Sequence, residues 1–85
     1  MKIIFSPDAL ADQEYFRQHT PKTAEKIRQL IKDIMQTPYS GLGKPEPLKH
    51  GLAGYWSRRI NREHRLVYTV EGDTLYVASC RYHYR

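Results

Sequence analysis

Residues 54–82, GYWSRRINREHRLVYTVEGDTLYVASCRY, decide the fold of this 85-residue chain. Aromatic and β-branched residues are frequent in the stretch, and two short polar segments, 61–63 and 71–73, interrupt it. Runs of β-prone residues separated by such turn signals are typical of antiparallel hairpins. Residues 47–51, which precede the stretch, have a similar character. The pattern predicts an antiparallel meander with strands near 47–51, 54–60, 64–70 and 74–82.

The N-terminal part predicts one strand and two helices. KIIF, residues 2–5, is a short apolar run, and Ser6-Pro7 and Thr20-Pro21 each place a capping residue before a proline, as helix starts often do. The first helix is expected to end near residue 18, and Thr37-Pro38 ends the second. An apolar stripe at helical period marks the second helix as core, and it contains Ala24, Ile27, Leu30, Ile31, Ile34 and Met35.

These elements predict an α+β fold in the order β-α-α followed by an antiparallel meander. Both helices are expected to pack on one face of the sheet, because a sheet and an amphipathic helix each bury one apolar side. A chain of 85 residues fits one domain, 1–85.

Composition and charge narrow the function classes. No apolar run approaches the roughly 20 residues that span a bilayer. The apolar run that follows Lys2 ends before Ser6 and is too short for the apolar segment of a signal peptide. We therefore expect a cytoplasmic protein without membrane contact, in which Cys80 is a small reduced core residue. The net charge is +5, of which residues 1–40 carry +1 and residues 41–85 carry +4. This asymmetry favours a polyanion-binding surface in the C-terminal half.

Hairpin register predicts which charged residues share a face. If the turns centre on Arg62 and Gly72, Arg59 lies opposite Arg65, and Arg65 lies opposite Ser79. One face then carries Arg59, Arg65, Arg81 and His83, and the other carries Ile60, Leu66, Tyr68, Val70, Tyr76, Ala78 and Cys80. The mostly apolar second set supports this register. A two-residue turn or a bulge in the second hairpin would flip the last strand.

Two features of this basic face admit more than one interpretation. The opposed pair Arg59 and Arg65 is either a set of solvated cations or an anion site, since opposed like charges cost stability. Glu46 lies between Pro45 and Pro47, whose rings restrict the backbone around it. It is either a surface acid that neutralises neighbouring lysines or a carboxylate held in one place.

The residue types match the needs of RNA cleavage. The 2′-hydroxyl must lose a proton and attack the adjacent phosphate, and the departing 5′-oxygen needs a proton, so the reaction requires a base, an acid and cations, but no metal. Glu46 is a candidate base, His83 a candidate acid, and Arg59 and Arg65 candidate phosphate ligands. Planes for base stacking are offered by Tyr55, Tyr82 and Tyr84. His19, His50 and His64 have no metal-binding spacing with Cys80, and we expect them to be surface or sheet residues.

Three stretches of the chain resemble a known family. GLGKPEPLKH (41–50), GYWSRRINREHRLVY (54–68) and CRYHY (80–84) are similar to segments of the YoeB toxins, within the RelE/ParE superfamily of toxin–antitoxin modules. The similarity runs from Lys2 to Tyr84.

The resemblance implies an activity, a site and partners. YoeB-like proteins are ribosome-dependent mRNA interferases that cut the codon in the ribosomal A site without a metal or cofactor. It implies a homodimer and an antitoxin of YefM type, whose acidic C-terminal segment wraps the toxin. Residues implied to act are Glu46, Arg65 and His83 in catalysis, and Lys49, Arg59 and Tyr84 at the substrate. Arg81 is a further candidate phosphate ligand, placed by the predicted face.

Two other functions remain open at this stage. A basic sheet of this kind would also serve a non-catalytic module that blocks the A site or binds RNA. A protein of the same superfamily that acts on DNA gyrase, as ParE-like toxins do, is the second alternative, although such toxins generally lack the Glu, Arg and His set.

Overall fold

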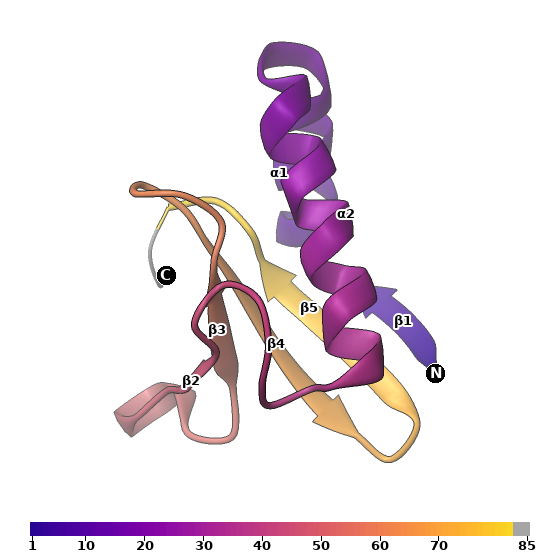
Figure 1. Ribbon diagram of the computed structural model, residues 1–85, viewed down its shortest axis with the longest axis vertical. Coiled ribbons are helices and arrows are strands. Elements are labelled where there is room, and N and C mark those ends of the chain that lie inside the picture. The colour runs from indigo at the N-terminus through magenta and orange to yellow at the C-terminus, as the bar shows by residue number, and fades with distance from the viewer. Residues whose placement is uncertain (83–85) are drawn as a thin grey trace.

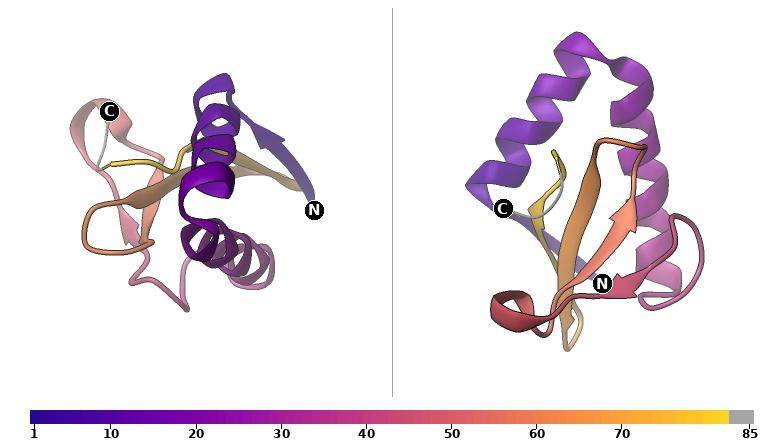
Figure 2. Two further views of the ribbon diagram at one scale, coloured as in Figure 1. Left: turned by 90° about the horizontal axis from the view of Figure 1, so that it is seen from above. Right: turned by 90° about the vertical axis from the view of Figure 1, so that its left-hand side faces the viewer.

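The computed structural model describes residues 1–82 (Figure 1). The elements follow in the order β1 (Lys2–Phe5), α1 (Pro7–His19), α2 (Pro21–Gln36), β2 (Glu46–Pro47), the 3-10 turn η1 (His50–Leu52), β3 (Trp56–Arg59), β4 (Arg65–Glu71) and β5 (Thr74–Ser79). Two helices form one layer and a five-stranded sheet forms the other, so the predicted α+β architecture is confirmed (Figure 2). No helix among the described residues has the length and apolar character needed to cross a membrane.

Local signals set the helix boundaries. The Ser6 hydroxyl oxygen accepts a hydrogen bond from the Ala9 backbone N–H at 3.0 Å, and it donates one to the Ala78 carbonyl at 2.5 Å. The cap thereby joins the start of α1 to β5 as well as satisfying a free N–H of the first turn. Both helices have proline at their first position, as predicted. Thr20 precedes α2, but its side chain makes no capping hydrogen bond.

The core lies between α2 and the inner face of the sheet, the face covered by the helices (Figure 2). Each fully buried aliphatic side chain contributes roughly 1.5–3 kcal/mol by leaving water. The buried helix residues are Ala9, Phe16, Ala24, Ile27, Leu30, Ile31 and Ile34, and the sheet contributes Leu66, Tyr68, Leu75 and Val77. Cys80 is also fully buried, as expected. The predicted apolar stripe of α2 is therefore the main helical contribution to the core.

The sheet has the strand order β1-β5-β4-β3-β2. The three pairs from β2 to β5 are antiparallel, which confirms the predicted meander. The first strand pairs in parallel with the last, with Lys2 opposite Thr74 and Phe5 opposite Val77. This crossover through α1 and α2 places both helices over the same face of the sheet.

The register of the first hairpin is as predicted, and that of the second is not. Arg59 lies opposite Arg65. In the second hairpin Glu71 pairs with Thr74 around a two-residue turn in which Gly72 has a φ of 57°, a value that favours glycine. Leu75 and Val77 therefore face the helices, and the predicted inward placement of Tyr76 and Ala78 is wrong.

A bulge restores the original alternation at the end of β5. Tyr68 pairs with Val77 but Val67 pairs with Ser79, so Ala78 is the extra residue. Because the extra residue shifts the pleat by one, Cys80 returns to the buried face. The two alternatives that the sequence left open for this hairpin, a two-residue turn and a bulge, both occur.

Two predicted strands are shorter than expected. The strand expected near 47–51 is reduced to the two-residue β2, because the chain enters η1 soon after the Leu48 N–H donates to the Tyr55 carbonyl at 2.9 Å. The strand expected to reach residue 82 ends at Ser79. Beyond it, Tyr82 adopts a φ of 63°, which an extended strand does not allow.

Candidate anion site on the open face of the sheet

A shallow pocket of about 170 Å³ lies on the sheet face opposite the helices, and its lining is strongly polar. The residues that line it are Lys44, Glu46, Ser57, Arg59 and Arg65. Three cations and one carboxylate thus share one small concavity. Three of the residues predicted for the functional site, Glu46, Arg59 and Arg65, meet there.

The strand register explains why these side chains converge. Glu46 of β2 pairs with Ser57 of β3, and Arg59 of β3 pairs with Arg65 of β4. Ser57 and Arg59 are two residues apart, so their side chains lie on the same face of the pleated strand. The four positions therefore form a zigzag across three neighbouring strands on the open face, with Glu46 on one side of β3 and Arg65 on the other.

Arg59 and Arg65 differ in how they are held. The Arg65 Nη1 atom donates hydrogen bonds to the carbonyls of Asn61 and His64, at 2.8 and 3.0 Å. The Arg59 backbone N–H donates to the Gly43 carbonyl at 2.6 Å, while its side chain is exposed. Within residues 1–82, neither guanidinium forms an ion pair with a carboxylate. Two opposed cations that are not ion-paired can bind an external anion, which would relieve their repulsion.

Glu46 also borders a second concavity, of about 540 Å³, which lies along the chain from β2 to η1. Lys49 lines that concavity together with Pro47, His50 and Leu52. Glu46 is thus the residue common to both pockets, with the two arginines on one side and Lys49 on the other. Lys49, which the resemblance implies as a substrate contact, therefore lies beside the same carboxylate.

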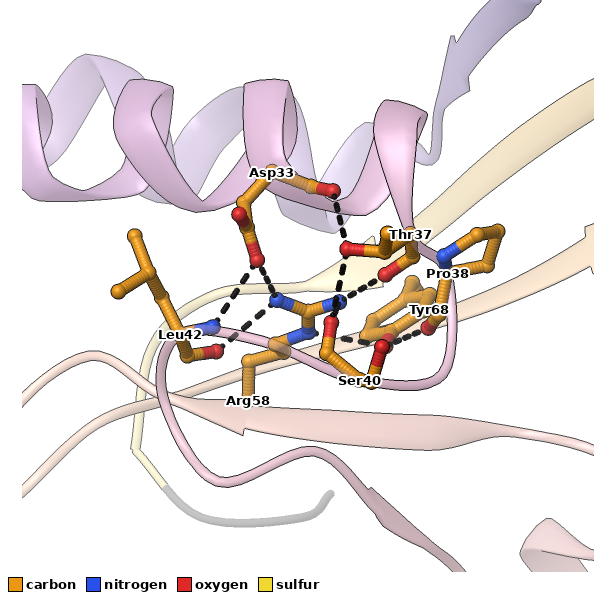
Figure 3. Close-up of polar contacts among 7 residues, drawn as sticks. All are labelled: Asp33, Thr37, Pro38, Ser40, Leu42, Arg58 and Tyr68. Carbon is orange, nitrogen blue, oxygen red and sulfur yellow. Dashed lines mark hydrogen bonds and ion pairs between the residues drawn. The ribbon is translucent and has the colours of Figure 1, made fainter.

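The loop that leads to Glu46 is fastened by a buried guanidinium (Figure 3). Arg58 follows Ser57 in β3 and is fully buried beneath the 37–42 segment. It pairs with the Asp33 carboxylate of α2 at 2.5 Å. Its other hydrogen-bond acceptors are the carbonyls of Thr37, Ser40 and Leu42 and the hydroxyl of Tyr68. A guanidinium has five N–H donors in a fixed plane, so this set of acceptors fixes the path of the loop.

Two neighbours complete this arrangement, and both have shifted pKa values. The Tyr68 hydroxyl donates to the Pro38 carbonyl at 2.6 Å, and burial raises the pKa of Tyr68 above its ordinary value. The hydrogen bond from the Leu42 N–H, followed by that from Arg58, lowers the pKa of Asp33 below 3.8. Asp33 is therefore ionised at neutral pH, as pairing with Arg58 requires.

Sequence reasoning missed Arg58, although a signal was present. The confirmed register places residue 58 opposite Leu66, on the face predicted to be apolar. A charged residue at an inward position needs several hydrogen-bond partners. Residues 37–45, which follow α2 directly, form a loop outside helix and strand, so their backbone carbonyls can accept hydrogen bonds from a side chain. The loop supplies those partners.

The C-terminal segment departs from its predicted placement. The expectation that Arg81 shares a face with Arg59 and Arg65 is wrong, because its guanidinium carbon lies 3.5 Å from the ring centroid of Tyr15 in α1. It lines a different pocket, next to the helices. His83 and Tyr84, predicted as acid and substrate contact, lie outside the described residues.

His64 was expected to be an ordinary surface or sheet residue, and it is neither exposed nor isolated. Only 7% of its surface is exposed, and its Nδ1 atom accepts a hydrogen bond from the Tyr82 N–H. In the part of the chain that the structure describes, no three His, Cys, Asp or Glu side chains cluster as metal ligands would. The chemistry offered by the open face is therefore that of a carboxylate beside clustered cations, suited to a phosphate group.

Comparison of the chain with known proteins identifies its family. The family model of YoeB-like toxins of bacterial type II toxin–antitoxin systems matches residues 5–84. Toxin YoeB of Escherichia coli strain K12 is 54% identical over 84 residues, which cover 99% of this chain and 100% of that protein.

Two solved structures agree in fold and sequence. A YoeB/ParE toxin from Agrobacterium tumefaciens superposes with a TM-score of 0.96 at 48% identity, covering 99% of this chain and 100% of that one. The YoeB chain of a YoeB–YefM complex from Staphylococcus aureus gives a TM-score of 0.91 at 52% identity, covering 99% and 98%. The resemblance seen in the three sequence motifs is thus confirmed, and the chain belongs to the YoeB-like toxins of bacterial type II toxin–antitoxin systems.

Proposed function

We propose that this toxin is a ribosome-dependent endoribonuclease that cleaves mRNA in the ribosomal A site and so inhibits translation. The observation that carries the proposal is the shared pocket of Glu46, Arg59 and Arg65. It supplies a carboxylate within the same small concavity as two guanidinium groups that form no ion pair among residues 1–82.

The proposed reaction is a transesterification that needs no metal. The Glu46 carboxylate takes the proton of the 2′-hydroxyl, and the resulting oxygen attacks the adjacent phosphorus. The bond from phosphorus to the 5′-oxygen breaks, and His83 gives that oxygen a proton. A 2′,3′-cyclic phosphate and a 5′-hydroxyl are the products.

Charge explains the roles of the remaining residues. The pentacoordinate phosphorus carries more negative charge than the starting phosphodiester, and Arg59 and Arg65 lie where they can bind its oxygens. Lys49, on the other side of Glu46, contacts the neighbouring phosphate of the strand. Tyr84 positions the substrate. The roles of His83 and Tyr84 rest on the sequence and on family membership.

The proposal includes partners. A YoeB–YefM complex and a YoeB dimer are both known from Staphylococcus aureus. We extend both to this chain, as a cognate YefM-like antitoxin and a homodimer. Action on ribosome-bound mRNA places the protein in the cytoplasm.

The test is to map the 5′ ends of a translated mRNA after incubation with purified protein, with and without ribosomes. We expect new ends at codon positions only when ribosomes are present, and their loss in Glu46→Gln, Arg65→Ala and His83→Ala. Arg28→Ala is the matched control, because Arg28 is an exposed cation of α2 far along the chain from the pocket. Translation arrest without new ends would instead indicate a module that only blocks the A site.

A further inference from the structure

His64 occupies the junction between the helices, the β3–β4 turn and the segment that follows β5. Its imidazole packs edge-on against Phe16 of α1, with ring centroids 4.9 Å apart, and lies 5.5 Å from the ring centroid of Tyr82. The ring therefore contacts the C-terminal segment at the last position that the structure describes.

Two hydrogen bonds hold the backbone of Tyr82. Its N–H donates to the His64 Nδ1 atom at 2.7 Å, and its carbonyl accepts from the Arg65 N–H at 2.8 Å. Consecutive residues of β4 and its preceding turn thus bind both polar groups of one residue. Arg65 is also the residue whose side chain lines the anion pocket.

The hydrogen bond to Tyr82 fixes the protonation of the imidazole. A backbone N–H only donates, so the Nδ1 atom that accepts it carries no proton. The ring proton of the neutral form is then on Nε2, which lies 3.6 Å from a Glu63 carboxylate oxygen. Protonation of Nδ1 would replace this attraction with a repulsion between two N–H groups.

The turn holds the imidazole in place. The Asn61 side-chain oxygen accepts hydrogen bonds from the backbone N–H groups of Glu63 and His64, both at 2.9 Å. The His64 carbonyl in turn accepts from the Ile60 N–H at 3.1 Å. Such side-chain bonds to the local backbone stabilise tight turns. The acceptor that meets Tyr82 is therefore pre-positioned.

We propose that His64 is a positioning residue that holds Tyr82 in place through a neutral imidazole, and that its protonation releases Tyr82. The proposal deepens the proposed function and rests on it, because the residue that follows Tyr82 in the chain is His83, the proposed acid. His64 acts through the Tyr82 backbone and takes no part in the proton transfers themselves.

Several charged or ionisable groups face the imidazole and set when it becomes protonated. Glu63 of the turn favours the cation, and Arg81 of the C-terminal segment opposes it. The other ionisable side chains that line this pocket are those of Tyr15 and Tyr82, and the groups from α2 and its cap are the hydroxyls of Thr20 and Thr23. The hydrogen bond to Tyr82 is therefore expected to be lost when acidification protonates the imidazole, at a pH that its own ring signals report.

The experiment follows the Tyr82 amide in the full chain by NMR hydrogen exchange, in parallel with cleavage of ribosome-bound mRNA. We compare the wild type with His64→Leu, His64→Asn and the control His19→Asn. The asparagine oxygen can accept at the Nδ1 position and cannot be protonated. His19 is an exposed histidine at the end of α1.

We expect His64→Leu to lower the protection of the Tyr82 amide roughly tenfold, the scale of one net hydrogen bond, and to lower the rate of cleavage at saturating ribosomes. His64→Asn keeps both and abolishes the acid dependence of the Tyr82 protection, and His19→Asn matches the wild type throughout. If the leucine variant does not fold, the proposal is still tested by following the Tyr82 amide protection of the wild type as His64 is protonated.

Two results would overturn the inference. One is Tyr82 amide protection that is unchanged in His64→Leu, or that is unchanged in the wild type through the protonation of His64 followed by its own ring signals. The other is a His64→Asn variant that keeps Tyr82 protected but cleaves as poorly as His64→Leu. Failure of the nuclease proposal itself is distinguishable, because it removes cleavage from the wild type and leaves the exchange pattern intact.

Discussion

Arg58 and Arg59 are consecutive residues of β3 whose side chains lie on opposite faces of the sheet. The first is fully buried and binds the loop after α2, and the second is exposed in the anion pocket. Because both arginines belong to β3, the position of this one strand determines both how the loop is held and where the pocket residue Arg59 lies. Any change that moves Arg58 therefore also affects the backbone that presents Arg59 and, through β2, Glu46.

Replacement of Arg58 by methionine tests the buried guanidinium as the fastening of this loop. The variant removes the guanidinium that donates to three carbonyls and to the Asp33 carboxylate, so we expect a loss of about 3 kcal/mol or more in the free energy of unfolding. Chemical denaturation measures it. Arg28→Met removes an exposed cation of α2 and serves as the control, with an expected change within about 0.5 kcal/mol. A loss in Arg58→Met no larger than in the control would contradict the assignment.

A substitution at Gly41, a residue of the same loop, tests the contact between the loop and the Asp33 carboxylate. It has a φ of 114°, and a Cβ atom built there would lie 2.2 Å from an Asp33 carboxylate oxygen. Gly41→Ala should therefore destabilise the protein by backbone strain, on the order of 1 kcal/mol, and further by displacing the partner of Arg58.

The matched control for that substitution is Gly54→Ala. Gly54 has a φ of 94°, but nothing lies within 4 Å of its Cβ position, so this variant carries the backbone strain without the collision. The excess destabilisation of Gly41→Ala over Gly54→Ala measures the contribution of the Asp33 contact. Equal losses in the two variants would show that the carboxylate simply moves aside.

Arg59→Ala separates binding from stability. Removing one of two opposed cations should leave the free energy of unfolding unchanged or raise it by up to about 1 kcal/mol. The same change should weaken RNA binding and lower the salt dependence of that binding by about one phosphate contact. Denaturation curves measure the first effect, and salt titrations of RNA binding measure the second. A loss of several kcal/mol in the free energy of unfolding would mean that Arg59 is structural.

The lowered pKa of Asp33 predicts a component of acid lability. Unfolding raises this pKa back toward 3.8, so the carboxylate stabilises the fold fully above pH 3.8 and loses that contribution as the pH falls through the lower folded value. Asp33→Asn should be less stable than the wild type near neutral pH. The gap between the two proteins should narrow below pH 3.8 in denaturation curves recorded from pH 6 to 2. A constant gap over that range would exclude the assignment.

The parts of the fold that could be predicted from the sequence are those with local signals. Ser6-Pro7 and the apolar stripe of α2 lie within a few residues of the structure they specify, and the register of the first hairpin follows from its turn. The register of the second hairpin differs because its turn has two residues, Gly72 and Asp73, and is not centred on Gly72. No glycine or proline marks the later bulge at Ala78. The parallel pairing of β1 with β5 joins residues some 70 positions apart and carries no local signal.

Some residues of the candidate site could likewise be predicted from local signals, and others could not. Glu46, Arg59 and Arg65 were predicted because turn arithmetic and flanking prolines restrict them. Arg81 was placed on the wrong side, since the left-handed backbone at Tyr82 and the contact with Tyr15 depend on tertiary packing. Arg58 and His64 were missed because a charged or polar residue is usually exposed. Only the assembled structure shows the partners that make their burial favourable, which are the acceptors of Arg58 and the Tyr82 N–H donor of His64.

The parallel pairing of β1 with β5 has a consequence for biosynthesis. A ribosome makes the chain from its N-terminus, so β1 has no strand to pair with until residues 74–79 have been added and have left the exit tunnel. The nascent toxin therefore cannot complete its sheet while most of it is still being translated.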